Sequence, residues 1–83
     1  MSEAREYRKR PVVITAVQWT GDNAEELKKF MGVVSINFGR VVISTLEGTM
    51  HADEGDWIIR GVKGQFYPCN PDIFSATYEL VHS

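Results

Sequence analysis

The spacing of apolar residues changes along this chain at Gly32, from a helical period to an alternating one. Before this point, Leu27, Phe30 and Met31 are spaced so that they share one face of a helix. After it, short runs of alternating apolar and polar residues are separated by glycines, which is typical of antiparallel strands joined by tight turns. The change predicts an α+β fold. In this single small domain, one amphipathic helix, at about residues 23–31, covers one face of a mainly antiparallel sheet.

The ends of the predicted helix carry suitable residues. Asp22 or Asn23 can cap its first turn, because their spacing to Glu25 or Glu26 matches a capping box. Gly32 can end the helix, because glycine readily adopts the left-handed conformation found just after helices. A helix this short is not stable by itself, so we expect it to pack on the sheet.

The segment with the strongest strand propensity is Pro11–Thr20, which is rich in β-branched residues. Both of its faces are apolar, which predicts a central strand or one that is covered on both sides. Further strands are expected at residues 33–38, 40–48, 49–53, 55–60, 65–69 and 78–81. Tight turns are expected at Phe38-Gly39 and at Glu47-Gly48.

A second, shorter helical segment is predicted at about residues 71–76. Asn70 suits its cap, and Pro71 suits its first helical position. Ile73 and Phe74 in this segment would close one edge of the sheet. Because one short helix cannot cover both faces of a sheet, we expect the other face to be solvated or covered by a second copy. A homodimer is therefore expected.

Length and composition limit what the chain can do. Its 83 residues make one domain at 11–83, preceded by a basic, partly flexible N-terminal arm at 1–10. The arm can touch an acidic partner or, weakly, a phosphate backbone, but the net charge of −2 gives the chain no general reason to bind nucleic acid. No apolar run is long enough to span a bilayer, and the first residues lack the apolar core of a signal peptide. The single cysteine cannot form an internal disulfide, which favours a reducing compartment such as the cytoplasm.

The hairpin expected at residues 55–69 carries the candidate binding residues. Trp57 and Tyr67 flank its turn, and Arg60 and Lys63 lie at the turn. An aromatic face beside cations can hold a small ligand such as a nucleotide through stacking and cation–π contacts. The same pattern is also compatible with a solvated loop between cross-strand aromatic pairs. We predict these four residues as the ligand-binding site.

No catalytic or metal site is predicted. The acidic residues at 53–56 surround a glycine, and their spacing matches no calcium-binding loop, so we interpret them as a turn. Cys69 would need a neighbouring base to act as a nucleophile, and no pattern brings His51 or His82 to it. We therefore predict a protein that is not an enzyme and that needs no cofactor.

Two segments resemble a family of small, uncharacterised proteins of tailed bacteriophages and prophages. EGDWIIRGVKGQFYPCNPDIFSATYEL is similar to the C-terminal family motif GDWIIxGVKGEFYPCKPDIFxxTYE, a relative of the PGDYG-type motif. RPVVITAVQWTGDN is similar to the family's opening, KPVVIEAxQWTGDN. The chain departs from the motif at Gln65, Asn70 and Ser75, where charged residues are usual.

The resemblance implies an accessory protein of a phage or prophage that acts in the cytoplasm of the host bacterium. We expect it to bind a host protein or a small ligand without catalysing a reaction. Two other functions stay open. One is binding or sequestering a nucleotide, and the other is a minor structural or assembly role in the virion.

Overall fold

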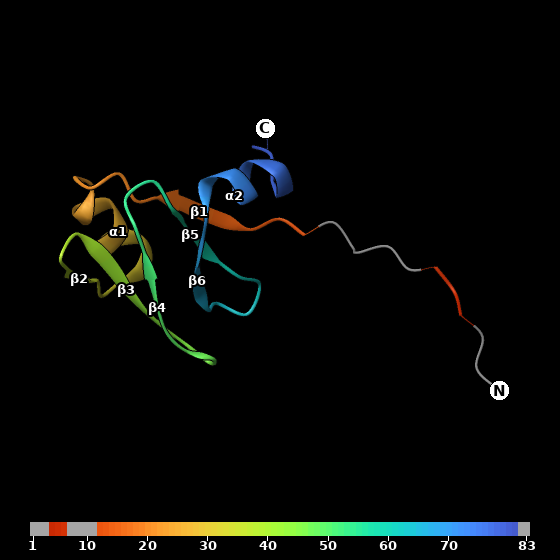
Figure 1. The fold of residues 1–83 in the computed structure, drawn as a ribbon, viewed down its shortest axis with the longest axis horizontal. Coiled ribbons are helices and arrows are strands. Elements are labelled where there is room, and N and C mark those ends of the chain that lie inside the picture. The colour runs from red at the N-terminus through yellow and green to blue at the C-terminus, as the bar shows by residue number, and fades with distance from the viewer. Residues whose placement is uncertain (1–3, 7–11, 82–83) are drawn as a thin grey trace.

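The computed structural model describes residues 4–6 and 12–81 (Figure 1). Most of the predicted basic arm at 1–10 therefore lies outside the described residues. The elements, in chain order, are β1 (Thr15–Gln18), α1 (Ala24–Met31), β2 (Ser35–Asn37), β3 (Arg40–Thr45), β4 (Gly48–Ala52), β5 (Trp57–Arg60), β6 (Phe66–Cys69) and α2 (Pro71–Thr77). This order confirms an α+β fold with one helix near residues 23–31 and a second late in the chain.

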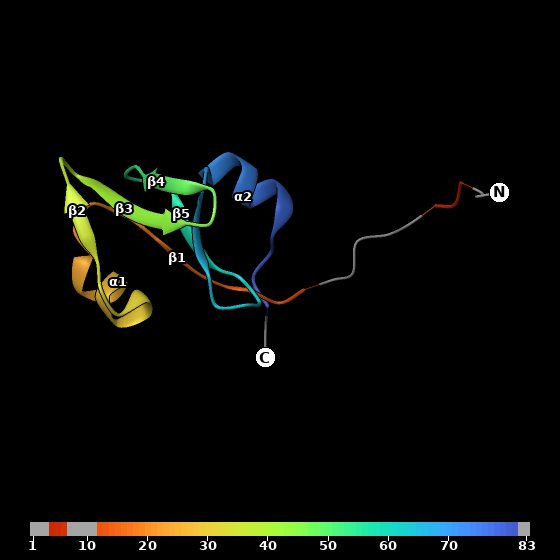
Figure 2. The same ribbon diagram turned by 90° about the horizontal axis from the view of Figure 1, so that it is seen from below.

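The strands in the described part of the chain form two antiparallel sheets of three strands each. One sheet has the order β1-β5-β6, and the other has the order β2-β3-β4. The two sheets meet where β6 contacts β3 and β4, and α1 closes one side of the molecule (Figures 1 and 2). The buried core consists of Trp19, Leu27, Val41, Ile43, Ala52 and Ile58.

The two faces of the β1-β5-β6 sheet carry different helices. Ile58 and Ile59 are adjacent in β5 and point to opposite faces, yet both are buried. On the face of Ile58, Phe30 of α1 packs edge-on against Phe66, with ring centroids 5.4 Å apart. On the face of Ile59, α2 packs against Trp57. The sequence predicts that this second face is left to solvent or to another copy, and α2 covers only the part of it around Trp57.

The helix ends follow the residues that predicted them. Gly32 has a φ of 89°, and its N–H donates to the carbonyl of Lys28, which ends α1. Asn70 begins α2, because its side-chain oxygen accepts the amide of Asp72 at 2.8 Å. Pro71 follows at the first helical position. Both of these local predictions are confirmed.

Asn23 precedes α1, but its side chain does not cap the helix. Its Oδ1 accepts the Thr20 N–H at 2.9 Å, and its Nδ2 donates to the Gln18 carbonyl at 2.8 Å. The Nδ2 group also donates to the Glu26 carboxylate at 2.7 Å. Asn23 therefore holds the connection between β1 and α1 and contacts a side chain of the first turn, without capping the backbone amides of the helix.

Tight turns join the strands of the β2-β3-β4 sheet. Phe38 and Gly39 both have positive φ, 52° and 77°, as a type I′ hairpin turn requires, and this confirms the first predicted turn. The second turn is formed by Leu46 and Glu47, between the end of β3 and the start of β4. It lies one residue earlier in the chain than predicted.

The strand β1 lies at the edge of its sheet, so of the two predicted alternatives, a central strand or one covered on both sides, the first is wrong. Among the described strands it pairs with β5 alone, with Thr15 opposite Arg60. The apolar residues of this segment contact other elements instead of neighbouring strands on both edges. Val17 packs against the core, and residues 12–16 border a groove. Sheet edges and sheet centres can therefore carry the same apolar pattern when the edge strand contacts other elements on its faces.

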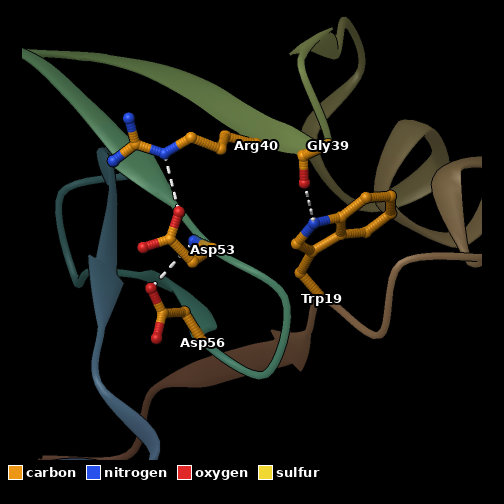
Figure 3. A network of polar contacts seen from close by, with 5 residues as sticks. All are labelled: Trp19, Gly39, Arg40, Asp53 and Asp56. Atoms are coloured by element: carbon orange, nitrogen blue, oxygen red, sulfur yellow. Dashed lines mark hydrogen bonds and ion pairs between the residues drawn. The ribbon is translucent and has the colours of Figure 1, made fainter.

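Trp19 joins the two sheets. Its side chain is only 2% exposed, and its indole N–H donates to the carbonyl of Gly39 at 2.9 Å (Figure 3). Trp19 follows β1, whereas Gly39 belongs to the turn between β2 and β3. The contact therefore ties the end of one sheet to a turn of the other, and the indole is part of the core.

Candidate functional site

An open groove of about 890 Å³ lies on the face of the β1-β5-β6 sheet that carries α2. Its sides are residues 12–16, the turn between β5 and β6, and the segment from the end of α2 to residue 81. Four aromatic side chains line it, namely Trp57, Tyr67, Phe74 and Tyr78. We call this feature the aromatic groove.

Ring stacking fixes the aromatic wall of the groove. The indole of Trp57 lies parallel to the ring of Phe74, with centroids 4.2 Å apart and planes 4° apart. The ring of Phe74 in turn contacts that of Tyr78, at a centroid distance of 5.1 Å. Stacked rings of this kind are worth about 0.5–1.5 kcal/mol beyond the area that they bury. Each ring therefore restrains the orientation of the next.

Two of the four predicted ligand residues lie together in the groove. Tyr67 is paired with Ile59 across the hairpin, and Trp57 lies two positions from Ile59 along β5, so Trp57 and Tyr67 share one face of the sheet. Burial raises the pKa of the Tyr67 hydroxyl above its ordinary value, and the neighbouring Tyr78 hydroxyl raises it further. Tyr67 therefore presents a neutral hydroxyl, able to donate and to accept a hydrogen bond.

Arg60 lies away from this aromatic pair. Its guanidinium carbon is 5.4 Å from the centroid of the Phe30 ring, on the face that α1 covers. The separation follows from the alternation of side chains along a strand, because Trp57 and Arg60 are three positions apart and point to opposite faces. An aromatic face and this cation therefore do not form one site.

Lys63 is exposed in the turn between β5 and β6. The two glycine amides of this turn are already engaged, since Gly61 donates to the Gln65 carbonyl at 2.8 Å and Gly64 donates to the Gly61 carbonyl at 2.9 Å. The turn therefore does not offer these amides to a phosphate or carboxylate. Its contribution to the groove comes from Gly61, Gln65 and the side chain of Val62.

The rim of the aromatic groove is apolar and open to solvent. Five aliphatic residues of the rim are exposed: Val12, Val13, Val62, Leu80 and Val81. Their exposed fractions run from 46% for Val12 to 79% for Leu80. Glu79 is the one charged residue among the described residues that line the groove. Exposed apolar side chains that gather around one concavity mark a binding surface, whereas scattered ones do not.

The C-terminal side of the groove differs from the prediction. A last strand is expected at residues 78–81, but α2 continues to Thr77 and no strand follows it among the described residues. Phe74 and Tyr78 lie against the groove instead. Their spacing of four residues, after the helix start at Asn70, was the signal that both belong on one side of a helix.

The acidic residues at 53–56 form a bulged turn. Gly55 has a φ of 99°, and its N–H donates to the Trp19 carbonyl at 2.7 Å. The Trp19 N–H donates to the Asp56 carbonyl at 2.9 Å. Gly55 and Asp56 thus both pair with the single residue Trp19. Two residues opposite one, with a left-handed glycine as the first of the two, is the pattern of a β-bulge. This geometry confirms the interpretation of the segment as a turn.

Two carboxylates of this turn hold it in place (Figure 3). Asp56 accepts the amide of Asp53 at 2.9 Å, and Asp53 accepts from the Nε group of Arg40 at 2.6 Å. Across residues 4–6 and 12–81, no group of three or more His, Cys, Asp or Glu side chains is placed to hold a metal ion.

Cys69 is partly buried at the end of β6. Burial raises the pKa of its thiol, and the nearby Asp56 carboxylate raises it further. Less thiolate is therefore present at any given pH, which is the opposite of an activated nucleophile. We expect iodoacetamide to alkylate Cys69 at about pH 8 at least about tenfold more slowly than it alkylates glutathione. In urea, where burial is lost, the two rates should converge; a native rate above that of glutathione would contradict this expectation.

Comparison with known proteins finds no family model, curated protein or solved structure that is significantly similar to the chain. Neither α1 nor α2 in the described part of the chain has the length and apolar character needed to cross a membrane.

Proposed function

We propose that this chain is a non-enzymatic binding protein and that the aromatic groove is its binding surface. The observation that carries the proposal is the coincidence of four aromatic side chains with five exposed aliphatic residues around one concavity. The volume of about 890 Å³ falls in the range of known ligand pockets. Binding would remove this apolar surface from water and supply the driving force.

The groove suits an uncharged apolar or aromatic group better than a phosphate. Its polar groups include the hydroxyls of Tyr67 and Tyr78 and the amide of Gln65, and the one charged group among its described lining residues, Glu79, is an acid that would repel a phosphate. The cation nearest in sequence to Trp57, Arg60, lies on the opposite face. A phosphate placed beside the aromatic wall would therefore lack the partners that such an anion needs. Within the predicted site, we retain Trp57 and Tyr67 as the ligand residues.

The resemblance to phage and prophage proteins supports a role in a bacterial host. The bound group would then be an apolar side chain of a host protein, or a small aromatic ligand in the host cytoplasm. Cys69 with its raised pKa, and the carboxylates that hold the bulged turn, favour binding over catalysis. A nucleotide-binding role and a minor virion role are the rival proposals.

A titration with Nile red, a neutral aromatic dye, tests the proposal. We expect the dye to bind the native protein and Leu80→Asp to weaken this binding by about tenfold or more, because it places a carboxylate on the apolar rim. Leu46→Asp is the matched control, since Leu46 is fully exposed at the turn between β3 and β4. Its affinity for the dye should be unchanged.

Equal binding by both variants would overturn the groove as the binding surface. A parallel thermal-shift series with mono-, di- and cyclic nucleotides at millimolar concentration separates the rival proposals. A ligand that binds the native state must raise its melting temperature. Stabilisation by nucleotides, without dye binding that Leu80→Asp reduces, would favour the nucleotide-binding protein instead.

A further inference from the structure

We propose that the free edge of β1 pairs with β1 of a second copy of this chain, antiparallel and about a two-fold axis. The dimer would continue each β1-β5-β6 sheet into the other. Residues 12–16 also form one side of the aromatic groove, but the pairing uses the backbone edge of the strand, so the inference does not depend on what the groove binds.

The hydrogen bonds of the bulged turn show which groups of β1 are free. The Trp19 amide donates to Asp56 of the neighbouring segment, and residues that bond to a neighbouring antiparallel strand alternate along the chain. With Val17 opposite Ile58 and Thr15 opposite Arg60, the odd-numbered residues bond to β5. The backbone groups of the even-numbered residues, Ile14, Ala16 and Gln18, therefore point away from the sheet.

Side-chain contacts leave most of this edge available. The Asn23 side chain donates a hydrogen bond to the carbonyl of Gln18, so this carbonyl at the C-terminal end of the edge is not available to a partner strand. Among the described strands, none pairs with the outer side of β1. The edge also lacks the usual protection against pairing, because residues 12–18 contain no charged residue and no proline. By contrast, β6 at the opposite edge of the sheet carries Pro68, which has no amide to offer a partner.

The edge is complementary to itself. With the Gln18 carbonyl taken, the remaining outward backbone groups belong to Ile14 and Ala16, which lie on either side of Thr15. A two-fold axis at Thr15 therefore sets Ile14 of each copy opposite Ala16 of the other. Thr15 then faces Thr15, a favourable cross-strand pair, and Val13 faces Val17. Val13 is 76% exposed in the single chain, and this pairing would cover it. No like charges meet anywhere along the seven residues at 12–18.

The charges that flank the strand favour a second copy in the antiparallel orientation. Arg8, Lys9 and Arg10 precede the strand in sequence, whereas Asp22 and Glu25 follow it. By sequence order alone, antiparallel pairing sets the side of the strand that the basic residues precede beside the side that the acidic residues follow, whereas parallel pairing sets like charges on the same side. The dimer should therefore weaken as salt rises.

Sedimentation over a concentration series tests the proposal on the full chain. We expect the wild type to reach twice the mass of one chain. Ala16→Pro should raise the dissociation constant on the order of 100-fold, because each copy loses an outward amide that pairs with its partner. The ladder between β1 and β5 does not use this amide, so circular dichroism should show the same fold. A wild type that stays a monomer up to about 1 mM, or an unchanged dimer in Ala16→Pro, would overturn the proposal.

A cross-link tests the register without relying on proline. In a Cys69→Ser background, Thr15→Cys should form a disulfide-linked dimer under mild oxidation, because directly opposed residues at a non-hydrogen-bonded position lie within disulfide range. Thr49→Cys, also at an exposed strand threonine, is the control and should remain mostly monomeric. Equal cross-linking of the two variants would contradict a specific β1 interface.

Discussion

Replacing Trp19 with alanine is expected to lower the free energy of unfolding by about 3–5 kcal/mol, the range for removing a buried aromatic side chain. The indole is 2% exposed and lies in the core with Ile58. The replacement also leaves the Gly39 carbonyl without its 2.9 Å partner. The free energy of unfolding of a native protein is only about 5–15 kcal/mol in total, so a large part of the variant protein should be unfolded near body temperature.

Urea unfolding followed by circular dichroism measures this effect. All variants should be compared at one protein concentration, since self-association raises apparent stability by mass action. Trp19→Phe keeps a ring but loses the N–H donor, so we expect an intermediate loss of about 1–3 kcal/mol. Phe38→Ala removes an aromatic ring that is 97% exposed and should change stability by less than about 0.5 kcal/mol. A Trp19→Ala loss as small as that of Phe38→Ala would refute the role of Trp19 in joining the sheets.

Replacing Leu27 with alanine is expected to cost about 2–5 kcal/mol, as for other fully buried leucines. Leu27 is the one buried residue of α1, and it packs in the same core as Val41 and Ile58. An isolated helix of eight residues is not stable in water. The helix therefore depends on this side chain, and the core under it depends on the helix.

Leu46→Ala is the matched control, because it is the same chemical change at a fully exposed turn position. It should alter the free energy of unfolding by less than about 0.5 kcal/mol. Amide hydrogen exchange distinguishes two outcomes for Leu27→Ala. Faster exchange in both α1 and β5 is the expected result, since they share one core. Faster exchange confined to α1, with β5 still protected, would mean that the helix is an independent cover and would contradict the expected loss.

Some of the aromatic groove could be found from the sequence, and some could not. Trp57 and Tyr67 were identified as candidate ligand residues because both are aromatic and flank one predicted hairpin, and they do lie on one face. Arg60 was grouped with them, although it lies on the other face over Phe30. The alternation along β5 contained this information, since Arg60 and Trp57 are separated by an odd number of positions. The C-terminal side of the groove was not predicted, because it is formed by residues at and after the end of α2, where the sequence predicted a strand.

The sequence by itself determined the elements whose causes are local. The period of Leu27, Phe30 and Met31 predicts α1, Gly32 ends it, and Asn70 with Pro71 begins α2. These features arise from backbone preferences and from hydrogen bonds within a few residues, so the local chain is sufficient to specify them.

Only the tertiary structure decided which strands pair and which faces are covered. An apolar, β-branched segment such as residues 11–20 is compatible with a centre or an edge of a sheet, because its propensity does not depend on how many neighbours it has. Its place at the edge follows from the folding of β2, β3 and β4 into a separate sheet. The free edge of β1 and the position of α2 over Trp57 are therefore consequences of long-range packing, in which residues distant in sequence compete for the same core.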